Sequence, residues 1–164
     1  MNFILLMNQY FREEKVESLI FGIVSILLIV LSCYLFFGVK SSFSKGIATV
    51  LLVSGLTGCI VGGTVFFRTD QQVRELTSLF KNNPNGFLQK ELPRMEKVMK
   101  SFKMYKFIYL VSFLCALSFI YLLKVEYWQG LALGLLVFGT LGMIIDLVAE
   151  RRGELYLNAL LELR

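Results

Sequence analysis

The chain has 164 residues, of which 56% are hydrophobic and only 18% are charged. A typical soluble domain carries about 45–50% apolar and about 25% charged residues, so this composition excludes intrinsic disorder and indicates a single domain surrounded by lipid. Three cysteines are too few for a secreted disulfide scaffold, and the lack of histidine excludes most general-base and zinc chemistry.

The N-terminal residues 1–11 are rich in Phe, Leu and Met, and we expect them to lie flat at a membrane interface. Four longer stretches contain no charged residue, namely residues 18–39, 46–67, 107–123 and 127–145. A bilayer core of about 30 Å needs roughly 20 helical residues, and backbone groups in lipid must be paired internally. The sequence therefore predicts an all-α integral membrane protein with four transmembrane helices, arranged as two tandem hairpins.

The central segment, residues 68–106, carries apolar residues at alternating spacings of three and four on both sides of a turn sequence, Asn-Asn-Pro-Asn-Gly at 82–86. This pattern predicts two helices that form an antiparallel hairpin in the cytosol. Pro93 is expected either to kink the second helix or to start it near Leu92; if the helix begins near Glu91, Pro93 lies in its first turn, where a missing donor costs little. The predicted seam of the hairpin consists of Val73, Leu76, Phe80, Leu88, Leu92, Met95, Met99 and Phe102.

Residues 146–164 are expected to continue the fourth span as a tail helix. Fourteen of the 17 basic residues lie in the N-terminal segment, the central segment and this tail. The positive-inside rule then predicts both termini in the cytosol, in the inner membrane of a bacterium. The same rule accounts for the basic central segment without nucleic acid, and a specific contact with anionic lipid head groups or with an acidic protein is the alternative.

Glycines are concentrated in the second and fourth spans, where small residues let helix backbones approach closely. The candidate packing residues are Gly55, Gly58, Gly62, Gly139 and Gly142. Residues 46–58 also resemble residues 130–142 at an offset of 84, with seven identities in thirteen positions. This likeness predicts an internal repeat of a two-helix unit. Packing within one chain is the main interpretation of the glycines, and formation of a homo-oligomer is the alternative.

The sequence contains no phosphate-binding loop, no nucleophile with an adjacent base and no metal-ligand spacing, so we expect no catalytic, cofactor-binding or metal-binding residue. Ionisable residues within membranes are the usual pointer to function. Asp146, near the end of the fourth span, is the nearest case. We expect it to form a buried ion pair with Arg68 or Arg151.

Three segments carry a resemblance to known proteins, at residues 91–102, 129–136 and 146–156. They resemble small four-helix bacterial membrane proteins, some of which act as immunity proteins beside secreted toxins. The resemblance implies a non-enzymatic membrane protein that binds a protein partner, specifically a membrane-acting toxin. A homo-oligomeric channel or small transporter is the alternative function.

Overall fold

The computed structural model describes residues 3–163, and its four long helices follow one another in chain order. Helix α1 (Phe3–Cys33) is extended by a short π-helix, η1 (Tyr34–Gly38), and is followed by α2 (Ser42–Asn82), α3 (Pro84–Leu122) and α4 (Glu126–Glu162). Each of the four is long and apolar enough to span a membrane. The chain is thus an all-helical protein with four candidate membrane spans.

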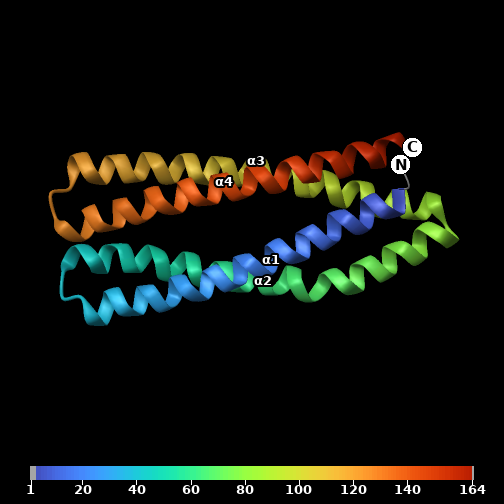
Figure 1. Ribbon diagram of the computed structural model, residues 1–164. Helices are drawn as coiled ribbons and strands as arrows, with labels where there is room; N and C mark the ends of the chain where they lie inside the picture. The colour runs from blue at the N-terminus through green and yellow to red at the C-terminus, as the bar shows by residue number, and fades with distance from the viewer. Residues whose placement is uncertain (1–2, 164) are drawn as a thin grey trace.

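The helices form two pairs that lie side by side in an elongated molecule (Figure 1). Helix α1 packs along α2, α3 packs along α4, and the two pairs meet mainly along α2 and α4. The start of α1, the end of α4 and the α2–α3 turn share one end of the molecule, and the α1–α2 and α3–α4 connections share the other (Figure 1). Each pair is therefore an antiparallel hairpin.

Each helix is about twice as long as a bilayer core is thick. Helix α2 has 41 residues, which at 1.5 Å per residue gives roughly 60 Å. The part that holds the four charge-free stretches is called the apolar half below. The rest, residues 3–17, 68–106 and 146–163, is called the charged half. Because no helix is interrupted where these halves meet, each span is rigidly connected to the charged half.

The apolar half is packed with small residues and exposes its large ones. Ser25, Ser32 and Ala132 are at most 2% exposed, whereas Val30 and Ile60 are 62% and 70% exposed. The Ser32 hydroxyl also donates a 2.7 Å hydrogen bond to the carbonyl oxygen of Ala48 on the neighbouring helix. In water this arrangement would be unfavourable, but lipid solvates large apolar side chains and small residues let membrane helices approach. This distribution fits a multi-pass membrane protein.

The charged half has the opposite arrangement, with large side chains inside. Its core is built from all four helices: Met7, Tyr10, Phe11, Leu76, Phe87, Met95, Tyr156 and Leu160 are each at most 5% exposed. Such a core is what water as the solvent requires. The two halves therefore bury opposite kinds of side chain, as expected for a molecule that is partly in lipid and partly in water.

The N-terminal segment differs from our prediction. Residues 3–11 are the first turns of α1 and are packed into the core of the charged half, so they do not lie flat at an interface; residues 1 and 2 are outside the described part. Met7 and Phe11 are completely buried, and the Tyr10 ring stacks on Tyr156 at 4.5 Å. The reason is that Phe3, Met7 and Tyr10 continue one helical stripe, which needs a partner surface.

The turn between α2 and α3 is shorter than predicted. Only Asn83 lies between the helices, and its side chain accepts a 2.9 Å hydrogen bond from the Gly86 backbone N–H, which caps α3. Pro84 occupies the first turn of α3, where a missing donor costs little. The second helix thus begins at Pro84, not near Glu91, and Pro93 lies inside it.

Glycine contacts within the two helix pairs recur at the offset of 84. A Cβ atom added to Gly55 would lie 2.8 Å from the Ile29 side chain, and one added to Gly139 would lie 3.1 Å from the Phe113 ring. Gly139 lies 84 residues after Gly55, and Phe113 lies 84 residues after Ile29. The same holds for Gly58 against Ser25 and Gly142 against Tyr109.

Candidate functional site

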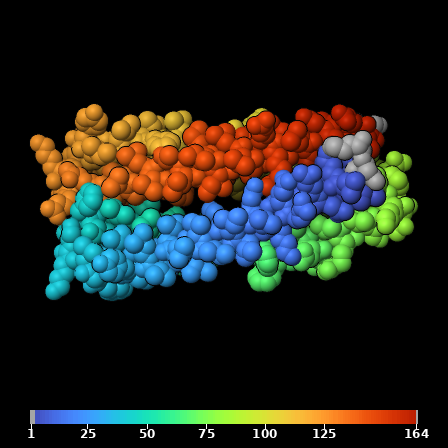
Figure 2. Space-filling model, in the orientation of Figure 1, coloured from blue at the N-terminus to red at the C-terminus, as the bar shows by residue number. Residues whose placement is uncertain are grey.

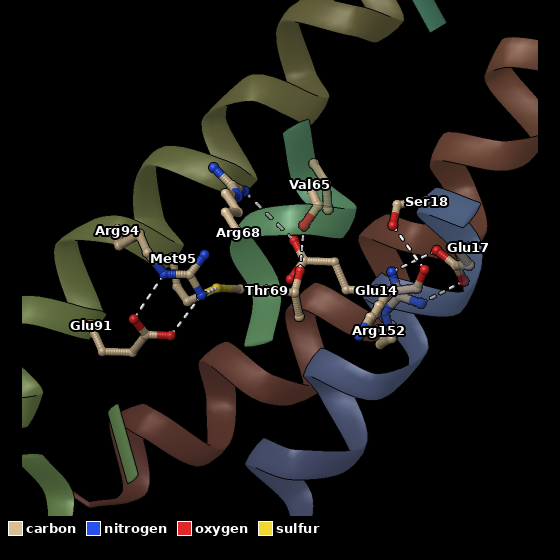
Figure 3. A network of polar contacts seen from close by, with 11 residues as sticks. Glu14, Glu17, Ser18, Val65, Arg68, Thr69, Glu91, Arg94, Met95 and Arg152 are labelled. Carbon is tan, nitrogen blue, oxygen red and sulfur yellow. Dashed lines mark hydrogen bonds and ion pairs between the residues drawn. The ribbon is translucent and has the colours of Figure 1, made fainter. Parts of the chain in front are cut away.

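Charged side chains from all four helices pair with one another where the two halves of the molecule meet (Figure 3). Arg152 on α4 donates a 2.6 Å hydrogen bond to Glu17 on α1. Lys15 on α1 donates one of the same length to Asp70 on α2. The first pair joins α1 to α4 and the second joins α1 to α2, so α1 is connected to both neighbouring helices.

Glu91 is the most deeply buried charged group of this region, with no exposed surface. Its carboxylate accepts hydrogen bonds of 2.8 and 2.6 Å from the Arg94 guanidinium (Figure 3). The Tyr156 hydroxyl donates a further hydrogen bond of 3.1 Å to the same carboxylate. Burial lowers the pKa of Arg94, but its hydrogen bonds to Glu91 outweigh burial and the net pKa is raised. Burial and the Glu91 charge raise the pKa of Tyr156. Arg94 and Tyr156 therefore supply hydrogen-bond donors to both carboxylate oxygens of Glu91.

Glu14, on α1, is less well satisfied. Its closest cation is the Arg68 guanidinium, 3.9 Å from Oε1, and its Oε2 atom is buried without a hydrogen-bond partner (Figure 3). Burial raises the pKa of the Glu14 carboxyl, although Arg94, Arg68 and Arg152 lower it. The desolvation of the carboxyl is therefore stronger than its attraction to the three guanidinium groups, and Glu14 is the site's least stabilised charge.

A cavity of about 650 Å³ begins at these charged groups and runs between the two helix pairs into the apolar half. Figure 2 shows the two pairs against each other, with α1 and the start of α2 in blue and teal and α4 in orange. The charged end is lined by Glu14, Glu17, Arg68, Arg94, Lys97 and Arg152. The apolar end is lined by Phe21, Val24, Leu28, Leu51, Val137 and Phe138. The cavity therefore has the polarity of an amphipathic molecule and the size of a ligand site.

The predicted ion pair of Asp146 with Arg68 or Arg151 does not form. Asp146 accepts a 2.8 Å hydrogen bond from the Tyr109 hydroxyl, Arg68 is nearest to Glu14, and Arg151 is exposed. The cation beside Asp146 is Lys106, which pairs with Glu150 instead at 2.5 Å. The sequence prediction took its partners from adjacent helix ends, whereas the rotation of α4 turns Asp146 toward α3.

The predicted packing glycines all lie at contacts between helices within the chain. Gly55, Gly58 and Gly62 face α1, and Gly139 and Gly142 face α3. An added Cβ atom on Gly62 would lie 2.9 Å from the Ser18 carbonyl oxygen. By contrast, Gly22 and Gly63 have no such neighbour within 4 Å.

The predicted hairpin seam becomes part of a larger core. Leu76 and Met95 are buried, and Val73, Phe80, Leu88 and Leu92 pack against the same cluster. Met99 and Phe102 instead face Gly153 of α4. These side chains meet α1 and α4 as well as each other, so the seam joins four helices instead of two.

Five residues of this site were not predicted as site residues from the sequence: Glu14, Glu17, Glu91, Arg94 and Arg152. One signal was available for Glu91, which follows Phe87 by four residues and precedes Met95 by four, so that it lies on an apolar helical stripe. A charge at such a position requires a buried partner. The other four residues gave no comparable signal, because each lies in a segment rich in charges.

Comparisons with known proteins give no further assignment of this site. No family model, curated protein or solved structure matches the chain. Within residues 3–163, no group of three His, Cys, Asp or Glu side chains is placed to hold a metal ion. The site is therefore interpreted from its own geometry.

Proposed function

We propose that this protein is a non-enzymatic, multi-pass membrane protein that binds a ligand in the cavity between its two helix pairs. The supporting observation is the cavity itself, because it is about 650 Å³ in volume, charged at one end and apolar at the other. Residues from all four helices line it, so a bound molecule would contact the whole bundle. We further propose that the charged half lies in the cytosol of a bacterial cell, because it holds most of the basic residues.

For the biological role, we propose protection against a membrane-acting toxin. Two of the segments that resemble immunity proteins, residues 91–102 and 146–156, contribute Arg94, Lys97 and Arg152 to the cavity. The resemblance and the cavity thus involve the same surfaces of α3 and α4. A toxin that carries both an apolar and a charged group has a complementary site there.

Co-expression with each toxin candidate from neighbouring genes tests this role. We expect the protein to restore growth against one candidate, and Leu28→Trp to abolish protection by filling the cavity. The matched control is Leu27→Trp, because Leu27 is the adjacent residue and is 61% exposed on the outer surface. Killing that is the same with and without the protein for every candidate would reject the role.

A channel or small transporter is the second candidate function. The observation that favours it is the course of the cavity along the helix axes, from Glu14 to Leu28. Purified protein in planar bilayers should then pass current that Leu28→Trp reduces and Leu27→Trp leaves unchanged. No current across a range of voltages and lipids would remove this candidate.

We also propose that the two helix pairs arose by duplication of one hairpin. The glycine contacts that recur at an offset of 84 support this origin. If each pair is a structural unit, fragments 1–82 and 83–164 should insert separately and co-purify when expressed together. Insertion of neither fragment alone would contradict the proposal.

A further inference from the structure

We propose that one anionic phospholipid from the surrounding bilayer occupies the cavity, with its phosphate group at Arg68 and Lys97 and an acyl chain in the apolar end. This inference rests on the proposed function, in that it assigns an occupant to the same binding cavity when no toxin is bound. It also names the residues that recognise the head group.

Two of the four basic residues at the charged end already have carboxylate partners. Arg94 is bound to Glu91 and Arg152 to Glu17, each by two guanidinium nitrogens. The Nε atom of Arg152 is nevertheless buried without an acceptor. Because this Nε atom is buried, it is not within reach of a molecule in the cavity, and neither arginine offers a free donor there.

The other two basic residues are available. Arg68 is 52% exposed and reaches only to 3.9 Å from Glu14. Lys97 is exposed and forms no ion pair within residues 3–163. Two cations that line one cavity without a close partner favour an anionic ligand, since phosphate accepts strong hydrogen bonds from both side-chain types.

The acidic groups that line the cavity do not neutralise the positive charge of Arg68 and Lys97. Of these acidic residues, Glu17 is paired with Arg152, and Asp146 accepts a hydrogen bond from Tyr109. Burial raises the pKa of both Glu14 and Asp146, which favours their neutral forms. A neutral carboxyl carries a hydrogen that it can donate to a phosphate oxygen.

The apolar end has the length and the opening that an acyl chain needs. Glu14 and Leu28 both line the cavity, and their 14-residue separation corresponds to roughly 21 Å along the helix. Val24 and Leu141 line it as well and are 42% and 53% exposed, so the cavity opens on the outside of the apolar half. A lipid chain can therefore enter sideways from the bilayer.

The charged end also lies at the right depth. Glu14 precedes the first charge-free stretch by four residues, and Arg68 immediately follows the second. These positions correspond to the boundary of the hydrocarbon core, where the phosphate groups of one leaflet lie. A bilayer lipid thus reaches both ends of the cavity without leaving its leaflet, which favours it over a free anion from solution.

Native mass spectrometry of the full-length protein, released from nanodiscs of equal phosphatidylglycerol and phosphatidylethanolamine, tests the proposal. We expect the wild type to retain one phosphatidylglycerol in preference to phosphatidylethanolamine. The double variant R68Q/K97Q should lose about tenfold or more of this retention, because each lost charge-assisted hydrogen bond weakens binding. Leu28→Trp should lose it as well, and Leu27→Trp should not.

The matched control is R74Q/K100Q, which removes the same charges from the same two helices at exposed positions that do not line the cavity. Equal losses in the two double variants would overturn the proposal, since retention would then reflect general surface charge. Equal retention of the two lipids by the wild type would overturn it too. Circular dichroism melting of each variant shows whether it is folded.

This measurement uses purified protein without toxin, so the two proposals can fail separately. Lipid retention without protection in cells would reject the toxin role alone. Protection in cells by a protein that retains no phosphatidylglycerol would reject the lipid proposal alone.

Discussion

Gly46 on α2 and Gly130 on α4 lie face to face where the two helix pairs touch. A Cβ atom on Gly46 would lie 2.6 Å from the Leu131 amide nitrogen, and one on Gly130 would lie 2.8 Å from the Phe43 carbonyl carbon. Both contacts are with backbone, which cannot rotate away as a flexible side chain can. The two glycines, 84 residues apart, therefore set the distance between α2 and α4.

Replacement of either glycine by alanine should force the pairs apart. We expect Gly130→Ala to destabilise the fold by about 1–3 kcal/mol, because overpacking shifts the backbone. Thermal unfolding in detergent, followed by circular dichroism, measures the effect. The control is Gly63→Ala, where an added Cβ atom meets nothing within 4 Å and alanine favours the helix. Equal melting temperatures for the two variants would contradict the proposed contact.

The buried carboxylate of Glu91 depends on Arg94. Arg94→Met should destabilise the protein by about 3–5 kcal/mol, because it leaves a buried charge unpaired. The triple variant E91L/R94M/Y156F removes every member of the network and should recover much of this loss. Chemical unfolding in urea with detergent gives the free energies. Lys90→Gln, on the same helix in an exposed pair with Glu75, should change little.

Glu14 should make stability depend on pH. Because burial raises its folded-state pKa above the ordinary value of 4.5, the folded protein binds a proton more tightly than the unfolded chain does. Its contribution to stability is therefore greatest at low pH and falls as the pH rises between the two pKa values. Glu14→Gln removes this dependence, so its melting temperature should exceed that of the wild type increasingly from pH 4.5 upward.

The control for this measurement is Glu96→Gln, at an exposed carboxyl on α3. It should run parallel to the wild type over the same pH range. A difference between Glu14→Gln and the wild type that does not change with pH would reject the explanation by desolvation of the carboxyl.

The N-terminal turns of α1 should be essential to the core of the charged half. Phe11 is completely buried, and Phe11→Ala should cost about 3–5 kcal/mol of stability. Thermal melting of the purified variant measures this loss. Phe37→Ala is the matched control because Phe37 is 80% exposed. Equal stabilities would indicate that residues 3–11 do not pack as described.

The orientation in the membrane can be tested with single cysteines at Asn85 and Lys124, which lie at opposite ends of the molecule. The natural cysteines, Cys33, Cys59 and Cys115, are first changed to serine or alanine. In intact cells, an impermeant thiol reagent should label position 124 and spare position 85. Labelling of both positions, or of 85 alone, would contradict cytoplasmic placement of the charged half.

The sequence alone predicted four apolar helices that could span a membrane, and roughly where each lies. Hydrophobicity is read along a continuous segment. The charge-free run from Ser18 to Val39 therefore predicts a candidate span, independently of how the neighbouring helices pack. The sequence also predicted that the glycines lie at helix contacts, because helices approach closely in lipid only where their residues are small.

Only the tertiary structure decided which side chains meet. The partner of Asp146, the burial of Phe11 and the isolation of Glu14 depend on how each helix is rotated about its axis and which helix lies beside it. A local pattern does not contain that information, since the charged segments are similar in composition around the whole bundle. The cavity arises in the same way, from residues on four helices that are separated along the chain by up to 142 positions, from Tyr10 to Arg152.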